Sequence, residues 1–257
     1  MSDTPELLIY CCPLSAVDDA LLERYAALLD TGERERFADL RRDSVRRIFL
    51  TSRALLRNTL STRLSCEPGD LRFYRDHNGK PQLREPATQW QFNLSHAGDW
   101  AVLALTNAGA IGVDVEVHER RNNLAGIARR FYTAQENIAL QPLSENEWNQ
   151  RFFELWTLKE AYVKALGRGI ATALAGTDIE YIDRHSVQLR LSGAARCEGD
   201  VRCWHYQLTE TDSLAGALIG HADTLATLNP ALYRVVPLRE APTPLSLSSG
   251  LSGFAKQ

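Results

Sequence analysis

The predicted secondary-structure elements occur in an order that repeats along the chain, and this repeat is the strongest constraint on the fold. A helical segment, FLTSRALLRNTL at 49–60, is followed by strands and then by the hairpin sequence WQFNLSHAGDWAVLAL at 90–105. The same order returns in LWTLKEAYVKAL at 155–166 and CWHYQLTETDSLAGALI at 203–219. Such a repeat predicts two similar α+β halves of roughly 110 residues each, facing one another.

Aligning the two copies suggests how the halves correspond. Arg53 then falls opposite Glu160, and Arg57 falls opposite Lys164. We expect each half to pack an antiparallel sheet on one long helix, the halves to be related by a pseudo-twofold axis, and the active site to lie between them. The halves are predicted at 1–110 and 111–236. Residues 237–257 are rich in proline, serine and glycine, which predicts a mobile tail.

Apolar periodicity and turn residues predict the individual elements within each half. Apolar runs, alternating or continuous, indicate strands, and leucine- and alanine-rich runs without proline indicate helices. The Asn78-Gly79 pair between two short strands is a strong hairpin signal. Strands are predicted at 7–12, 71–76, 80–83, 90–95, 100–106, 110–117, 178–183, 186–191, 203–209 and 214–220. Helices are predicted at 17–30, 44–62, 124–131, 134–140 and 147–166.

The composition is that of an ordinary globular protein. The chain is 44% apolar and 24% charged with a formal net charge of −3, so its overall charge does not favour nucleic acid or a membrane surface. No stretch reaches the ~20 apolar residues of a membrane span, and the first residues do not resemble a signal peptide. The five cysteines form no CxxC pair, which favours a reducing compartment without disulfides. We therefore expect a cytoplasmic protein.

One segment is basic within this acidic protein. Residues 32–57 hold eight arginines against four acidic residues. The arginines are Arg34, Arg36, Arg41, Arg42, Arg46, Arg47, Arg53 and Arg57. This local excess of positive charge indicates an anionic ligand, although a solvated helix with charge pairs at i,i+4 spacing explains the same pattern.

The strand GVDVEV carries two carboxylates on one face. Side chains alternate across a strand, so Asp114 and Glu116 project together while the valines point to the other side. Two adjacent carboxylates repel unless a cation or water separates them. Hard oxygen ligands with an open side suit Mg²⁺, which completes its shell with water and phosphate. An amphipathic edge strand is the alternative interpretation.

The helix FELWTLKEAYVKALGRG at 153–169 places charged residues among aromatic ones. Lys159 lies within its apolar stripe, and Glu160 and Lys164 follow the aromatic residues of the adjacent face. If Glu160 meets Asp114 and Glu116, it completes a three-carboxylate Mg²⁺ site, and the two lysines neutralise phosphate oxygens near the metal. Alternatively, Lys159 extends its ammonium to the surface and Glu160–Lys164 is an exposed pair.

Two turns hold further candidate phosphate ligands. Ser95 and His96 lie where a strand turns, and both can donate hydrogen bonds to a phosphate. Lys80 follows the Asn-Gly turn and is constrained by Pro81, so its ammonium is held at the rim of a hairpin. The P-loop, Rossmann and nucleophile-elbow motifs are absent from the sequence.

Four motifs together resemble one family. NGKP at 78–81, FNLSH at 92–96, IGVDVE at 111–116 and FELWTLKEAYVKALGRG at 153–169 are similar to the ordered motifs of the 4′-phosphopantetheinyl transferases. The length and the two-half pattern resemble the larger, monomeric type that activates peptide synthetases such as surfactin synthetase. The similarity covers residues of about 33–182, and the combination of GVDVE with WxxKExxxK is its most specific part.

The resemblance implies a reaction. Members of the family move 4′-phosphopantetheine from coenzyme A to a serine of an apo carrier protein (acyl, polyketide or peptidyl) and release 3′,5′-ADP. It implies Mg²⁺, or Mn²⁺ in its place, with coenzyme A as co-substrate. The C-terminal half would hold the metal and the chemistry, and the N-terminal half would hold the 3′-phosphate and adenine of coenzyme A.

The resemblance also implies roles for individual residues. The implied metal ligands are Asp114, Glu116 and Glu160. The implied catalytic residues are Glu160 as general base, with Lys164 and His96 at the pyrophosphate. The implied coenzyme A contacts are Arg46, Arg47, Arg53, Lys80, Pro81, Ser95, His96, Lys159 and Lys164. Glu136 aligns with a further acidic residue of the family and is a candidate metal or carrier contact.

A carrier-docking surface is implied at 119–132, ERRNNLAGIARRFY. Its apolar stripe with an arginine rim suits an acidic helix of the carrier. The candidate docking residues are Leu124, Ile127, Ala128, Arg129 and Phe131, with Arg120 and Arg121 at the rim. A core-facing helix with an exposed basic side is the alternative.

Two other classes of protein remain as alternatives. A Mg²⁺-dependent pyrophosphohydrolase acting on nucleotides or coenzyme A would use the same carboxylates with a positioned water. A non-catalytic module binding coenzyme A or a carrier would tolerate damage to the three carboxylates, yet Asp114, Glu116 and Glu160 are all present. We expect a monomer that binds neither nucleic acid nor a membrane.

Overall fold

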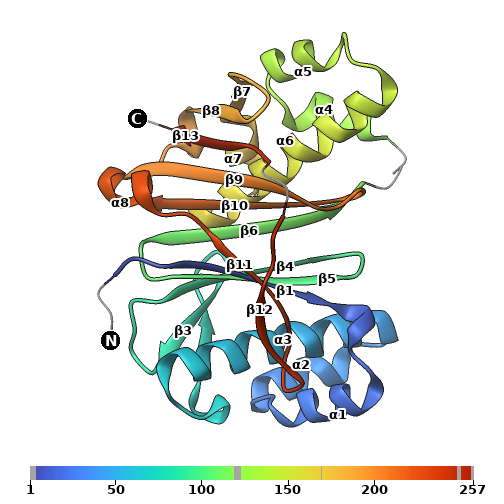
Figure 1. Ribbon diagram of the computed structural model, residues 1–257, viewed down its shortest axis with the longest axis vertical. Helices are drawn as coiled ribbons and strands as arrows, with labels where there is room; N and C mark the ends of the chain where they lie inside the picture. Colours follow the sequence, from blue (N-terminus) through green and yellow to red (C-terminus); the bar gives the residue numbers. More distant parts are fainter. Residues whose placement is uncertain (1–3, 119–122, 169, 248–249, 256–257) are drawn as a thin grey trace.

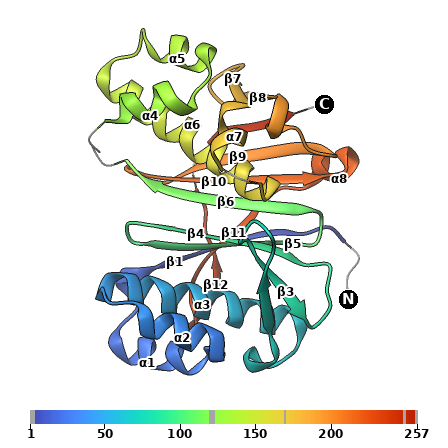
Figure 2. The same ribbon diagram turned by 180° about the vertical axis from the view of Figure 1, so that it is seen from behind.

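The apolar runs of the sequence form two β-sheets that pack face to face between two layers of helices (Figure 1). The computed structural model describes residues 4–118, 123–168, 170–247 and 250–255. The view from behind shows the same four layers, with helices on the outer face of each sheet (Figure 2). Apolar side chains of both sheets, including Ile9 and Val113, fill the space between them. The predicted α+β class is confirmed.

The N-terminal half packs helices on one five-stranded sheet. In spatial order its strands are β12 (Glu240–Pro244), β11 (Ala231–Val236), β1 (Leu7–Pro13), β5 (Trp100–Thr106) and β4 (Gln91–Ala97). Its helices are α1 (Asp19–Ala27), α2 (Thr31–Asp39) and α3 (Asp43–Leu64), with 3-10 turns at Leu14–Ala16 and Pro68–Asp70. A separate hairpin consists of β2 (Arg72–Arg75) and β3 (Pro81–Glu85). The positive φ of Gly79, 84°, is the turn conformation that the Asn-Gly signal predicted.

The C-terminal half packs its helices on a six-stranded sheet. In spatial order its strands are β6 (Ala110–Val117), β10 (Asp212–Gly220), β9 (Asp200–Thr209), β13 (Ser252–Ala255), β8 (Ser186–Leu191) and β7 (Thr177–Tyr181). Its helices are α4 (Leu124–Phe131), α5 (Ala134–Leu140), α6 (Glu145–Leu166), α7 (Ile170–Ala175) and α8 (Ala222–Thr227), with a 3-10 turn at Gly193–Ala195. The long helix α6 contributes most of the aromatic core beneath this sheet.

The repeated order is visible in the strand pairing. β1 pairs antiparallel with β5, and β6 pairs antiparallel with β10, so each half begins with a strand that joins the hairpin ending that half. α3 and α6 are both 22 residues long. Arg57 is the fifteenth residue of α3 and Lys159 is the fifteenth of α6. The helix boundaries therefore correct the expected alignment, in which Arg57 fell opposite Lys164.

The segment predicted as a mobile tail instead forms two strands. β12 pairs with β11, and β13 inserts between β9 and β8. β11, which we placed in the C-terminal half, pairs parallel with β1 of the other sheet. A Cβ on Gly250 would lie 1.8 Å from the His205 carbonyl oxygen, and one on Gly253 would lie 2.3 Å from that of Val187. These glycines permit close backbone approach, so their abundance was misread as a sign of mobility.

Candidate active site

A glycine brings the strand with the two acids against the long helix α6. A Cβ on Gly112 of β6 would lie 2.0 Å from the Ala161 carbonyl oxygen and 2.3 Å from the Ala165 nitrogen. Only a residue without a side chain allows the two backbones to approach so closely. The contact sets Asp114, two residues further along β6, beside Lys164 of α6.

Asp114 is the buried centre of the polar cluster. Its Oδ1 accepts hydrogen bonds from the Ser95 hydroxyl at 3.0 Å and from Lys164 Nζ at 2.5 Å. Its Oδ2 is buried and accepts no hydrogen bond from the described residues. Burial raises the pKa of the Asp114 carboxyl, and Lys164 and Ser95 oppose this effect. A buried carboxylate oxygen without a partner is costly, which suits a ligand-binding role.

Glu160 and Glu116 lie near Asp114 and complete the acidic group. Burial and the charges of Asp114 and Glu116 raise the pKa of the Glu160 carboxyl to about 7, although Lys164 lowers it. Glu116 Oε1 accepts a hydrogen bond from Trp156 Nε1 at 3.1 Å. Glu160 therefore lies close enough to Asp114 and Glu116 to feel their charges, and the predicted three-carboxylate metal site remains a prediction.

The donor set fits Mg²⁺ without forming a closed cage. Among the described residues, no three histidine, cysteine, aspartate or glutamate side chains enclose a metal position. Mg²⁺ needs only one or two protein carboxylates, because water and substrate phosphates complete its octahedral shell. The free Oδ2 of Asp114 and the neighbouring Glu160 carboxyl are hard oxygen donors of this kind.

The motif FNLSH holds the two halves together at this site. Asn93 Oδ1 of β4 accepts a hydrogen bond from the Val113 backbone N–H at 3.0 Å, and Ser95 Oγ accepts one from Val115 at 3.4 Å. The two side chains thereby satisfy backbone donors on the outer edge of β6. Ser95 also accepts from Lys164 Nζ at 3.1 Å, so its hydroxyl is occupied by contacts within the protein. The predicted phosphate contact of Ser95 remains a prediction.

Lys80 joins the two halves through backbone carbonyls of the C-terminal half. Its Nζ donates to the carbonyl oxygens of Ile111 at 2.9 Å and Lys164 at 2.8 Å. Asn78 Nδ2 donates to the Gly167 carbonyl at 2.5 Å. Burial lowers the pKa of the Lys80 ammonium to about 8. The hairpin lysine therefore binds one carbonyl of β6 and one at the C-terminal end of α6, where the helix dipole favours a cation. The predicted contact of Lys80 with coenzyme A remains a prediction.

A cavity of about 400 Å³ opens beside the acidic cluster, between α3 and β4. Its apolar wall includes Phe49, and its polar groups include Arg53, Arg75 and His96. Arg53 is only 12% exposed, its NH1 lies 3.6 Å from Glu33 Oε1, and its Nε has no hydrogen-bond partner among the described residues. Burial and the nearby guanidinium groups of Arg75, Arg36 and Arg57 lower the pKa of Arg53, with Glu33 opposing. The unpartnered Nε of Arg53, together with the exposed guanidinium group of Arg75 beside it, favours an anion in this cavity.

Two of the predicted arginines lie elsewhere. Arg46 stacks over the Phe37 ring at 3.8 Å and donates to the carbonyls of Phe37 and Leu40. Arg47 donates to the Val17 carbonyl and pairs with Asp19 at 3.0 Å. Both guanidinium groups stabilise the ends of neighbouring helices, and neither lines the cavity.

The cavity includes one residue that the sequence analysis did not name and two that it did. Arg75 was not predicted, although it is the cross-strand partner of Pro81 in the β2–β3 hairpin. That pairing was the available signal, because opposite residues of a hairpin share one face. Pro81 also lines the cavity, and its contact with coenzyme A remains a prediction. Burial and the charge of Lys164 lower the pKa of His96, so this imidazole is neutral near pH 7.

The helix predicted to dock the carrier turns part of its apolar stripe inward. Leu124 and Ala128 are buried in the core, which contradicts their assignment to an exposed docking surface. Ile127 and Phe131 are half-buried against the same core, and Arg129 is exposed. Arg120 and Arg121 lie outside the described residues. The stripe serves the core first, as expected for an amphipathic helix on a sheet.

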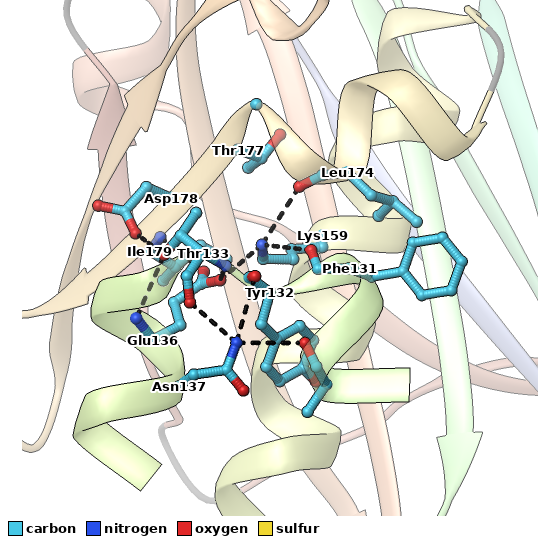
Figure 3. A network of polar contacts seen from close by, with 12 residues as sticks. Phe131, Tyr132, Thr133, Glu136, Asn137, Lys159, Leu174, Thr177, Asp178 and Ile179 are labelled. Atoms are coloured by element: carbon cyan, nitrogen blue, oxygen red, sulfur yellow. Dashed lines mark hydrogen bonds and ion pairs between the residues drawn. The ribbon is translucent and has the colours of Figure 1, made fainter. Parts of the chain in front are cut away.

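Lys159 and Glu136 form a buried pair away from the acidic cluster (Figure 3). Lys159 Nζ lies 2.7 Å from Glu136 Oε2, and the two side chains are 0% and 1% exposed. Neither can reach coenzyme A or a metal in this arrangement. The prediction that Lys159 neutralises phosphate is therefore wrong, because residue 159 points to the opposite side of α6 from Asp114.

The fold and the site together define a class of proteins with two related α+β halves, an acidic centre where the halves meet, and a cationic cavity in the N-terminal half. Residues 110–219 match the family model of the 4′-phosphopantetheinyl transferase superfamily, and residues 18–108 match the model 4′-phosphopantetheinyl transferase, N-terminal. The chain belongs to the 4′-phosphopantetheinyl transferase superfamily. None of the helices in the described part of the chain has the length and apolar character needed to cross a membrane.

Curated relatives carry the same family name. A putative 4′-phosphopantetheinyl transferase, slr0495 of Synechocystis, is 36% identical over 66% of this chain and 68% of its own length. The 4′-phosphopantetheinyl transferase HetI of Nostoc is 36% identical over 60% of this chain and 65% of its own length. The 4′-phosphopantetheinyl transferase Sfp of Bacillus subtilis is 27% identical over 72% of this chain and 76% of its own length.

Proposed function

We propose that this protein transfers the 4′-phosphopantetheine arm of coenzyme A to a serine hydroxyl of an apo acyl, polyketide or peptidyl carrier, releasing 3′,5′-ADP. The observation that carries the proposal is the meeting of Asp114, Glu160 and Lys164 beside the cationic cavity. Phosphoryl transfer depends mainly on positioning and on stabilising charge, and this arrangement offers both.

The cavity suits the nucleotide end of coenzyme A. Arg53 and Arg75 bring two guanidinium groups to an anionic 3′-phosphate, and Phe49 offers an aromatic surface for the adenine. The bound nucleotide extends from there past His96 towards Lys164, which would donate to pyrophosphate oxygens. His96, with its lowered pKa, donates as a neutral imidazole.

The acidic cluster suits Mg²⁺ and the transfer step. Asp114 and Glu160 would offer the ion its protein oxygens, with Glu116 beside them on the same strand as Asp114, and the ion's charge would stabilise negative charge developing on the pyrophosphate. Glu160 lies beside Asp114 and Lys164 in the site and is placed to accept the serine proton. The serine oxygen bonds to the phosphorus that carries pantetheine, and the bond from that phosphorus to the leaving 3′,5′-ADP oxygen breaks. Lys164 is suited to stabilise the leaving phosphate.

Intact-mass spectrometry of an apo carrier, mixed with this protein, coenzyme A and Mg²⁺, tests the proposal. We expect a carrier gain of about 340 Da, the mass of the added phosphopantetheine arm. EDTA should abolish the gain, and Mn²⁺ should be tested for restoring it. Consumption of coenzyme A without any carrier gain would identify a pyrophosphohydrolase instead.

A further inference from the structure

The buried pair of Glu136 and Lys159 is a junction of several elements (Figure 3). Lys159 Nζ donates to the carbonyl oxygens of Phe131 at 3.3 Å and Leu174 at 3.2 Å, in addition to its 2.7 Å contact with Glu136. Glu136 accepts hydrogen bonds from the backbone N–H groups of Thr133 at 2.8 Å and Ile179 at 2.9 Å. The ammonium and both carboxylate oxygens are thus fully engaged.

These contacts tie one corner of the fold to the catalytic helix. Phe131 is the last residue of α4 and Glu136 lies in the first turn of α5, so we name residues 131–136 the α4–α5 corner. Lys159 immediately precedes Glu160 in α6. The ammonium also lies at the C-terminal ends of α4 and α7, where carbonyls favour a cation. The α4–α5 corner therefore contacts Lys159 directly, and Lys159 is adjacent in the helix to Glu160, the proposed general base.

The buried ion pair is not explained by its contribution to stability. Two ions removed from water lose hydration free energy that their mutual attraction only partly replaces, and apolar residues of similar volume often stabilise a fold at least as much. What the ions add is direction, because each charged group is held by its partner ion and by two backbone groups. Geometry is thus a better explanation of the pair than stability.

A second line of contacts runs from the same corner to the acids. The Phe131 ring packs edge-on against Trp156 with centroids 5.8 Å apart, and the Trp156 indole donates to Glu116. Arg129 and Arg130, which precede the corner, are exposed. The corner thus lies between the exposed Arg129 and Arg130 and the acidic cluster. It is connected to Glu116 through Phe131 and Trp156, and to Glu160 through Glu136 and Lys159.

We infer that Lys159 and Glu136 are positioning residues, which hold the α4–α5 corner so that a carrier docked on it presents its serine to Glu160. This inference rests on the proposed function. It assigns neither residue a contact with coenzyme A, with the metal or with the serine. Loosening the corner should therefore weaken productive use of the carrier and leave coenzyme A binding unchanged.

The test compares kinetic constants of three variants with those of the wild-type chain. The double variant Lys159→Met/Glu136→Leu removes both charges without leaving one buried alone. Asn137→Ala loosens the same corner differently, because Asn137 Nδ2 donates to the carbonyls of Ala128, Tyr132 and Thr133 at 3.0–3.2 Å. Glu154→Gln is the matched control: Glu154 is a buried carboxylate of the same helix, but it contacts Tyr181 and Arg151.

We expect the double variant to raise the KM for the carrier about tenfold and Asn137→Ala to raise it about threefold, in line with a displacement of reacting groups by a fraction of an ångström. The KM for coenzyme A should stay within twofold in both. Glu154→Gln should leave both KM values unchanged at an equal loss of thermal stability. A purely structural role would instead lower activity towards both substrates in proportion to the fraction folded.

Other outcomes separate the two proposals. A wild-type carrier KM in both corner variants overturns the positioning role and leaves the transferase intact. An equal rise in both KM values also overturns it. If the double variant does not fold, Asn137→Ala decides alone. Absence of any transfer by the wild-type chain to several apo carriers overturns the proposed function, and the inference falls with it.

Discussion

The two halves of the molecule contain the same kind of buried glutamate–cation ion pair at corresponding positions. Glu33 is the third residue of α2 and Glu136 the third of α5, and each completes a capping box at the start of its helix. Glu33 Oε2 accepts from Arg57 Nε at 2.8 Å, as Glu136 pairs with Lys159. Each cation is fully buried and also binds backbone carbonyls. The repeat is thus a repeat of scaffold chemistry.

The two halves differ at the residue that follows the buried cation of each ion pair. Arg57 is followed by Asn58, whereas Lys159 is followed by Glu160. The first strands differ too: β1 is covered by β11 on one side and β5 on the other, whereas β6 is the edge of its sheet. The outer edge of β6 is met by side chains of β4 from the other half. The active site therefore forms where the two halves stop being equivalent.

The largest effect should come from the position at which the helices diverge. Glu160→Gln removes the proposed proton acceptor and should lower kcat about 10²–10⁴-fold, the usual contribution of a general base. The dissociation constant for coenzyme A should change less than twofold, measured by calorimetry without carrier. Asn58→Ala, at the corresponding position of α3, should leave kcat unchanged. Equal turnover by Glu160→Gln would remove this residue from the proposed mechanism.

Disturbing the close approach of β6 to α6 should lower activity nearly as much as Glu160→Gln. Gly112→Ala inserts a methyl group 2.0 Å from the Ala161 carbonyl, so the helix must shift. A displacement of about 1 Å should lower kcat/KM about 100-fold. Gly216→Ala on β10 is the matched control, because its Cβ would have nothing nearer than the Ile9 methyl at 3.6 Å. Similar losses in the two variants would show that glycine spacing is not what places the acids.

The two hairpins carry histidines of opposite character, and the difference should appear in the pH dependence of stability. His205 in the C-terminal half is 2% exposed, and burial lowers its pKa to about 4. The unfolded chain, with a pKa near ~6.5, therefore binds this proton first as the pH falls. The stabilising effect of the neutral imidazole is complete above pH ~6.5 and is lost between ~6.5 and ~4.

Urea unfolding at pH 7.5 and pH 5 tests this. At pH 5, His205 should account for a loss of about 2 kcal/mol, or a roughly thirtyfold change in the unfolding equilibrium. His205→Gln should reduce the difference between the two pH values by that amount. His96→Gln, on the exposed end of β4, should reduce it much less. An unchanged pH dependence in His205→Gln would contradict the assigned pKa.

The arginine cavity should give the smallest effect. Arg53→Met should raise the KM for coenzyme A about tenfold with little change in kcat, because a charge-assisted contact is worth about 1.5–3 kcal/mol. The defect should shrink at high salt, which screens the ion pair in the wild-type protein. Arg46→Ala should leave this KM unchanged, since Arg46 lies over Phe37. The reverse result would move the nucleotide site towards the start of α3.

Strong local signals predicted most elements and part of the site. The boundaries of α4 and α5 and the face shared by Asp114 and Glu116 follow from periodicity and caps that act within a few residues. α2 was missed because its sequence, TGERERFAD, has little apolar periodicity. β11 was missed because its partner β1 is distant in the sequence, and β12 was missed because its exposed sequence EAPTP contains two prolines and no apolar alternation.

The sequence by itself determined the family, the two-half α+β pattern and the acids that meet at the site, because periodicity, turn residues and motif spacing are properties of neighbouring residues. Only the tertiary structure decided which cations serve ligands and which serve the fold. Lys80 and Lys159 look like phosphate ligands in the sequence, yet both bind backbone carbonyls. A charge is assigned by what surrounds it, and packing between distant segments supplies those surroundings.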